Sequence, residues 1–147
     1  MQDRIRIDQL EPASYKPMIA LEKYLATIDI ESTLKELIKV KASIINKCAY
    51  CIQIHTEQAR KTGETEQRLY ALSAWQESPL FTEKERATLA LTEEVTLISK
   101  QGLSDKTYTK ALKDLGEKGM AQCIMQIVTI NAWNRIALST KMYHPSN

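Results

Sequence analysis

Apolar residues recur along this chain mostly at intervals of three and four positions, and rarely in strict alternation. Such intervals place side chains on one face of an α-helix, whereas alternation is typical of a β-strand. The chain contains only four glycines and four prolines to interrupt this pattern. We therefore predict an all-helical protein of about seven helices. We assign residues 1–147 to a single domain, because this length suits one domain.

The predicted helices are bounded by residues that are typical of helix ends. Gly63 and Gly116 are expected to end helices, since glycine readily adopts the left-handed conformation that follows a helix. Thr82 and Glu85 form the capping-box pattern that begins a helix. The predicted helices cover residues 12–27, 33–46, 48–62, 65–76, 83–99, 105–115 and 118–142.

The last predicted helix differs from the others because apolar residues cover most of its circumference. Met120, Ile127 and Trp133 are examples from its different sides. A helix that is apolar nearly all round is expected to be buried on most sides. Residues 118–142 are therefore predicted to form the central core helix, part of a subunit interface, or both.

Charge and hydropathy exclude several classes of protein. Lysine and arginine total 20 against 18 aspartate and glutamate residues, and the net charge of +2 gives no electrostatic reason to expect a nucleic-acid partner. No stretch approaches the roughly 20 apolar residues of a membrane-spanning helix. The first residues carry charges with no apolar segment behind them, unlike a secretory signal. We expect a cytoplasmic protein with neither a nucleic-acid nor a membrane partner.

Cys48, Cys51 and His55 occupy positions i, i+3 and i+7, which lie along one stripe of a helix. Asn46 is expected to cap the N-terminus of this helix. Both thiols would then lie in the first turn, where unpaired backbone N–H groups and the helix dipole favour a thiolate. The imidazole of His55, one turn beyond Cys51, could act as a base or as a charge partner for its sulfur.

This set of residues suits thiol–disulfide chemistry, in which a thiolate attacks a peroxide or a disulfide and a second thiol resolves the product. Two alternatives remain open. A zinc site usually needs four ligands, and beyond this cluster the chain offers only Cys123 and His144. The pair could also be two buried core cysteines, although Lys47 beside it indicates a partly exposed helix start. We expect neither a metal nor a cofactor.

The same region also resembles a known family. The matching stretches are residues 36–43 (ELIKVKAS), 46–51 (NKCAYC), 77–79 (ESP), 85–87 (ERA) and 130–135 (INAWNR), together with His55. With these, most of residues 31–138 resembles the alkyl hydroperoxidase D-like branch of the carboxymuconolactone decarboxylase family. Its decarboxylase branch lacks the cysteine pair, which disfavours a lactone decarboxylase.

The resemblance implies an all-helical subunit of the alkyl hydroperoxidase D-like fold that assembles into a homotrimer or a homohexamer. It implies a peroxidase that reduces a hydroperoxide with electrons from a thiol or lipoyl-type reductant. Carried over to this chain, Cys51 resembles the peroxide-reacting thiol, and Cys48 resembles its partner, more open to the reductant. His55 and Glu36 resemble the proton relay of such a site.

Two features leave alternatives to these assignments. Thr33 and Glu36 have the spacing of a capping box, so Glu36 could serve only the helix backbone. Some peroxidase members carry a histidine between the cysteines, where this chain has Tyr50. The alternative functions are therefore a non-catalytic redox-sensing or assembly protein, or a disulfide reductase without peroxidase turnover.

Overall fold

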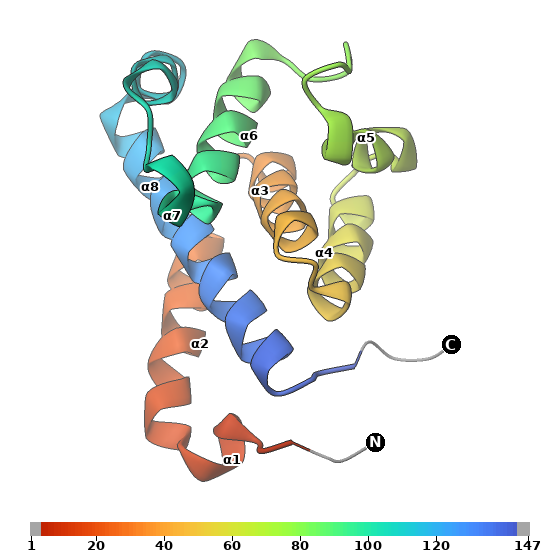
Figure 1. Ribbon diagram of the computed structural model, residues 1–147, viewed down its shortest axis with the longest axis vertical. Coiled ribbons are helices and arrows are strands. Elements are labelled where there is room, and N and C mark those ends of the chain that lie inside the picture. Colours follow the sequence, from red (N-terminus) through yellow and green to blue (C-terminus); the bar gives the residue numbers. More distant parts are fainter. Residues whose placement is uncertain (1–3, 144–147) are drawn as a thin grey trace.

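The computed structural model describes residues 4–143, and within them the chain forms helices and no strand (Figure 1). This confirms the predicted all-helical class. The elements are α1 (Ile7–Leu10), α2 (Pro12–Thr27), α3 (Ser32–Ile45), α4 (Ala49–Lys61), α5 (Glu66–Ala71), the 3-10 helix η1 (Leu72–Ala74), α6 (Glu83–Thr96), α7 (Ile98–Gln101) and α8 (Asp105–Ser139).

Most predicted boundaries agree with the structure, and the exceptions have local causes. The four-residue helix α1 was not predicted because it is too short to show a periodicity. The predicted helix 83–99 ends at Thr96, and α7 follows as a separate turn. Gly116 was expected to separate two helices, and its φ of 70° and ψ of 169° break the helical geometry inside α8.

The predicted capping box at the start of α6 is present. The backbone N–H of Thr82 donates to Glu85 Oε2 at 2.8 Å, and the N–H of Glu85 donates to the Thr82 hydroxyl at 3.2 Å. Two backbone donors that have no partner within the helix are therefore satisfied at this end.

Helix α8 forms the centre of the core, where it packs against α2, α3 and α6. One side of the helix buries Met120, Cys123, Ile127 and Ile130 among apolar residues of α3 and α6. Another side leaves Met125, Val128 and Leu138 exposed by 42%, 48% and 44%. The expected burial of α8 is therefore found on the side that faces α3 and α6, whereas the apolar residues Met125, Val128 and Leu138 remain exposed in the subunit. No helix among residues 4–143 is long and apolar enough to cross a membrane.

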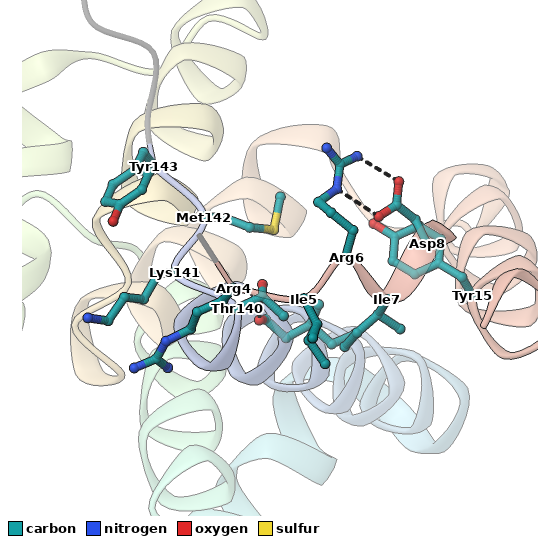
Figure 2. Close-up of a pocket in the computed structure, with 11 residues that line it drawn as sticks. Arg4, Ile5, Arg6, Ile7, Asp8, Tyr15, Thr140, Lys141, Met142 and Tyr143 are labelled. Carbon is teal, nitrogen blue, oxygen red and sulfur yellow. Dashed lines mark hydrogen bonds and ion pairs between the residues drawn. The ribbon is translucent and has the colours of Figure 1, made fainter. Parts of the chain in front are cut away.

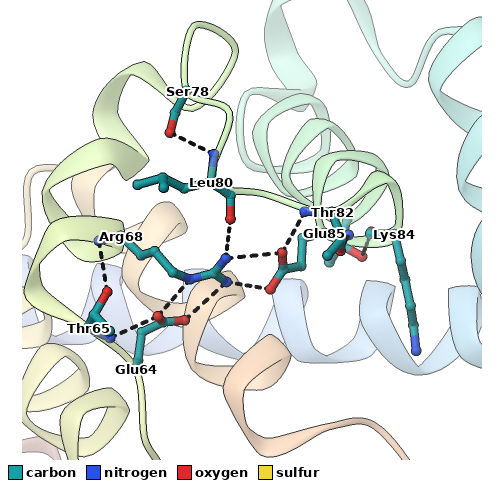
Figure 3. Close-up of polar contacts among 9 residues, drawn as sticks. Glu64, Thr65, Arg68, Ser78, Leu80, Thr82, Lys84 and Glu85 are labelled. Carbon is teal, nitrogen blue, oxygen red and sulfur yellow. Dashed lines mark hydrogen bonds and ion pairs between the residues drawn. The ribbon is translucent and has the colours of Figure 1, made fainter.

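Arg68 of α5 holds the segment between α5 and α6 against the core (Figure 3). Its guanidinium donates to Glu64 Oε1 at 2.7 Å, and also to the Leu80 carbonyl and to Glu85. It lies 4.9 Å from the centre of the Phe81 ring. Because Glu64 is only 6% exposed, its carboxylate depends on Arg68 for charge compensation.

Replacing Arg68 by methionine is expected to lower the free energy of unfolding by about 2–4 kcal/mol, since it leaves the buried carboxylate of Glu64 without its partner. Arg60→Met is the matched control, because its ion pair with Glu66 is exposed on both sides. That control is expected to cost less than about 1 kcal/mol. Urea unfolding followed by circular dichroism measures both, and equal losses would contradict the assigned role of Arg68.

Candidate active site

The cysteine pair lies at the start of α4, but Asn46 does not cap this helix as predicted. Asn46 is the C-cap of α3, and Lys47 follows it with a φ of 58° that turns the chain. Cys48 is itself the N-cap of α4, where its Sγ accepts the N–H of Cys51 at 3.4 Å. The prediction was wrong because the turn between the helices takes two residues more than the sequence pattern indicated. A disulfide joins Cys48 and Cys51, whose Cα atoms are 5.3 Å apart.

The side chain of Asn46 anchors this turn to α8. Its amide nitrogen donates to Asn131 Oδ1 at 2.9 Å and to Asn134 Oδ1 at 2.8 Å. Asn134 in turn donates to the Ser43 hydroxyl at 3.0 Å, and the Ser43 carbonyl accepts the N–H of Cys48 at 3.0 Å. A buried amide network therefore connects the backbone of the first cysteine to the central helix.

Both cysteines are buried in the subunit. Cys48 is 1% exposed and Cys51 is 4% exposed, and both pack against Ala137 near the end of α8, with Tyr50 beside them. Neither cysteine is open in this disulfide-bonded subunit, so the expectation that Cys48 is more open to the reductant stays a prediction.

Glu36 of α3 and His55 of α4 face each other across the pair of helices. Glu36 Oε2 lies 3.4 Å from His55 Nδ1, and the two side chains are 8% and 20% exposed. The alternative of a capping box with Thr33 is excluded, because α3 has Glu31 at its N-cap and no side-chain cap. The fold thus brings Glu36, His55 and the cysteine helix together, as the resemblance implied.

A lysine that was not singled out from the sequence completes the surroundings of Glu36. Lys39 Nζ lies 3.1 Å from Glu36 Oε1 and 3.4 Å from Glu22 Oε1 of α2. Glu22 also accepts the indole N–H of Trp133 at 3.2 Å. The three-residue spacing of Glu36 and Lys39 on one helix could have predicted their ion pair from the sequence. The contact with Glu22 could not be predicted in this way, because it depends on how α2 packs.

This arrangement keeps Glu36 ionised despite its burial. Burial by itself raises the pKa of the Glu36 carboxyl, but the interaction with His55 and the positive charge of Lys39 outweigh it and hold the pKa below its usual value. At neutral pH Glu36 is therefore a carboxylate that lies 3.4 Å from His55 Nδ1.

The described residues do not bring a metal site together. Between residues 4 and 143, no group of three or more His, Cys, Asp and Glu side chains is placed to hold a metal ion. Cys123 lies in the separate core cluster of α8, where burial raises the pKa of its thiol to about 11. His144 lies outside the described residues.

Comparison with known proteins identifies the family. The model of the carboxymuconolactone decarboxylase family matches residues 12–94. The chain belongs to this family. It is 39% identical over 139 residues to the uncharacterized protein YdfG of Bacillus subtilis (strain 168), and the match covers 95% of each chain.

Solved structures extend this result to the fold. A crystal structure of a protein of unknown function from Agrobacterium tumefaciens, described as a candidate AhpD antioxidant defence protein, is 35% identical. It superposes with a TM-score of 0.95 over 99% of this chain and 100% of that chain, which confirms the predicted alkyl hydroperoxidase D-like fold. The debrominase Bmp8 without ligand has a TM-score of 0.82 over 92% of this chain and 73% of its own. At 21% identity it shows the shared fold alone.

Lys39→Met is expected to raise the pKa of the Glu36 carboxyl, because burial then loses one of the two interactions that offset it. Carbon-detected NMR titration of the glutamate carboxyl groups measures this pKa.

The lowered pKa of Glu36 also makes the stability of the unaltered protein depend on pH. Ionised Glu36 stabilises the folded state above pH 4.5, the ordinary pKa of a glutamate carboxyl, and this contribution is lost as the pH falls below that value.

Lys35→Met is the matched control, since Lys35 lies in the same helix and contacts only the carbonyls at the end of α2. It is expected to leave the Glu36 titration unchanged. An unchanged pKa in Lys39→Met would show that His55 alone keeps the carboxyl ionised.

Proposed function

We propose that the protein is a thiol-dependent peroxidase that reduces hydroperoxides through a dithiol–disulfide cycle of Cys48 and Cys51. The observation that carries the proposal is the cysteine pair at the start of α4, joined as a disulfide, with His55 one turn further along the helix. The similarity to the AhpD-type protein of Agrobacterium tumefaciens supports an antioxidant role of this kind.

The positions of the side chains suggest a separate role for each residue in the proposed reaction. Cys51 and His55 are four residues apart on α4, so their side chains are neighbours on one helix face. His55 would accept the proton of the Cys51 thiol and raise its thiolate fraction near neutral pH. Glu36 would hold the imidazole in place through its contact with Nδ1.

The proposed cycle has three balanced steps. The Cys51 thiolate attacks the terminal oxygen of the hydroperoxide, the O–O bond breaks, and the alkoxide takes a proton from protonated His55 to leave as an alcohol. The Cys48 thiol then attacks the sulfenic acid on Cys51, which forms the disulfide and releases water. A thiol or lipoyl-type dithiol reduces this disulfide by exchange and is itself oxidised to a disulfide.

The two alternative functions use the same residues but omit the first step. A disulfide reductase would cycle Cys48 and Cys51 with disulfide substrates only, and a redox-sensing or assembly protein would change state without turnover. Steady-state consumption of hydroperoxide with a dithiol reductant separates the peroxidase from both alternatives. Consumption supports the peroxidase, whereas its absence favours one of the alternatives.

Single substitutions are expected to separate the roles of the two thiols. Cys51→Ser should abolish the reaction with hydroperoxide, and Cys48→Ser should allow one oxidation that stalls as a sulfenic acid or a mixed disulfide. His55→Ala should slow the reaction of Cys51 about 100-fold or more. Glu36→Gln should slow it less and shift its pH dependence. Stopped-flow peroxide reaction and alkylation rates across pH measure these effects.

Cys123→Ala is the matched control for these cysteine variants, because Cys123 is buried in the core away from the pair. It should react with hydroperoxide as the unaltered protein does. If Cys48 proves to have the lower thiol pKa and His55→Ala leaves Cys51 unchanged, the roles of the two cysteines are reversed.

The exposed side of α8 supports a further proposal, that the subunit assembles into a homotrimer or a homohexamer. Met125 and Val128 lie one turn apart on this side, and both are more than two-fifths exposed, at 42% and 48%. Apolar residues that one subunit leaves uncovered on its central helix suit burial against another copy.

Analytical ultracentrifugation is expected to give a mass of three or six times 16.8 kDa. The double variant Met125→Glu and Val128→Glu should dissociate this assembly, because it places charges in the apolar contact. Leu10→Glu, at a 64% exposed position of α1, is the control and should leave the mass unchanged. A stable monomer at micromolar concentration would contradict the proposal.

A further inference from the structure

The two ends of the described chain line a common pocket of about 540 Å³ (Figure 2). The segment before α1 contributes one wall, and the last turn of α8 with residues 141–143 contributes another. Arg4 ties the two walls together, since its guanidinium donates to the Ser139 carbonyl at 2.7 Å.

The lining of this pocket combines apolar walls with two basic groups. Ile5, Ile7 and Ile136 supply apolar surface, and the charged ends of Arg4 and Lys141 lie on the same side of the pocket in Figure 2. Polar and apolar groups share the lining in similar measure, and polar groups placed beside apolar walls can orient a small ligand. Apolar walls also strengthen the attraction of such cations for an anion.

Neither of these two cations is neutralised by a carboxylate of the described chain. Arg6 pairs with Asp8 at 2.7 Å, so that pair contributes no net charge. Within residues 4–143, no carboxylate lies within ion-pair distance of Arg4 or Lys141. Among the described residues, the lining of the pocket therefore includes two positive charges without a carboxylate partner.

The pocket and the cysteine pair lie at the same end of α8. Tyr15 lines it, and burial raises the pKa of this phenol, with Asp8 and Tyr50 close enough to add to the increase. Tyr50 stands between the two cysteines in the chain and packs beside them. On the other wall, Ile136 precedes Ala137, the residue of α8 against which both cysteines pack.

We propose that this pocket binds an organic carboxylate with an apolar chain. We also propose that one of the two substrates of Cys48 and Cys51, the hydroperoxide or the reductant, carries this carboxylate. The carboxylate would contact Arg4 and Lys141, and the chain would run along the isoleucines toward Tyr15. The role as a substrate site rests on the function proposed above, whereas the binding itself does not. Either the hydroperoxide or the reductant could carry the carboxylate.

Calorimetric titration with octanoate and its neutral analogue octanamide tests the binding. We expect saturable binding of octanoate that is at least tenfold tighter than that of octanamide at low salt. The double variant Arg4→Gln and Lys141→Gln should lose this preference. Lys113→Gln with Lys118→Gln makes the same change in charge at exposed positions of α8 and should retain it. Absent binding, or equal affinity for the two compounds, would overturn the proposal.

Two matched pairs of substrates then identify which one carries the carboxylate. A fatty-acid hydroperoxide is compared with its methyl ester, and dihydrolipoate is compared with dihydrolipoamide. We expect a higher kcat/KM for the carboxylate in one pair and loss of this difference in the Arg4 and Lys141 double variant. Equal kcat/KM values in both pairs would overturn the substrate role. Absence of all turnover would contradict the proposed peroxidase, while the calorimetry still decides the binding.

Discussion

The connection between α3 and α4 is the constraint on which the candidate site depends. Three asparagines from two distant segments fix it, with Asn46 donating to both Asn131 and Asn134 of the central helix. Because these amides are largely buried, the network has few alternative arrangements and a high cost of disruption. The turn sets where α4 begins, and the start of α4 sets the position of both cysteines. The cysteine pair is therefore placed by the core of the protein and not by its own helix alone.

A second consequence of this turn is electrostatic. The antiparallel packing of α3 on α4 brings the buried carboxyl of Glu36 to within 3.4 Å of His55 Nδ1. A carboxyl in this position would favour its neutral form if burial acted alone. Lys39 and His55 together reverse that preference, so that a fixed negative charge lies behind the imidazole. This is the arrangement that a base needs if it is to take a proton from a neighbouring thiol and keep its orientation.

The burial of both cysteines bears on how substrates reach them. With exposures of 1% and 4%, neither sulfur offers a broad surface to a large partner. The pocket lined by the two ends of the described chain lies at the same end of α8 as the pair, since Ile136 lines it and Ala137 packs against both cysteines.

The sequence by itself determined the helical class, most helix boundaries, the capping box at Thr82 and a helix that begins at the cysteine pair and carries His55. These features depend on interactions between residues close in the chain, which leave a period or a spacing. The tertiary structure decided that Asn46 contacts α8 instead of capping α4, that Glu36 lies beside His55 instead of capping with Thr33, and that Cys48 is buried. It also brought Glu22 to Lys39 and joined the two chain ends in one pocket. Such contacts link residues far apart in the chain, and no local pattern encodes which of several possible partners a polar side chain will meet once the helices pack.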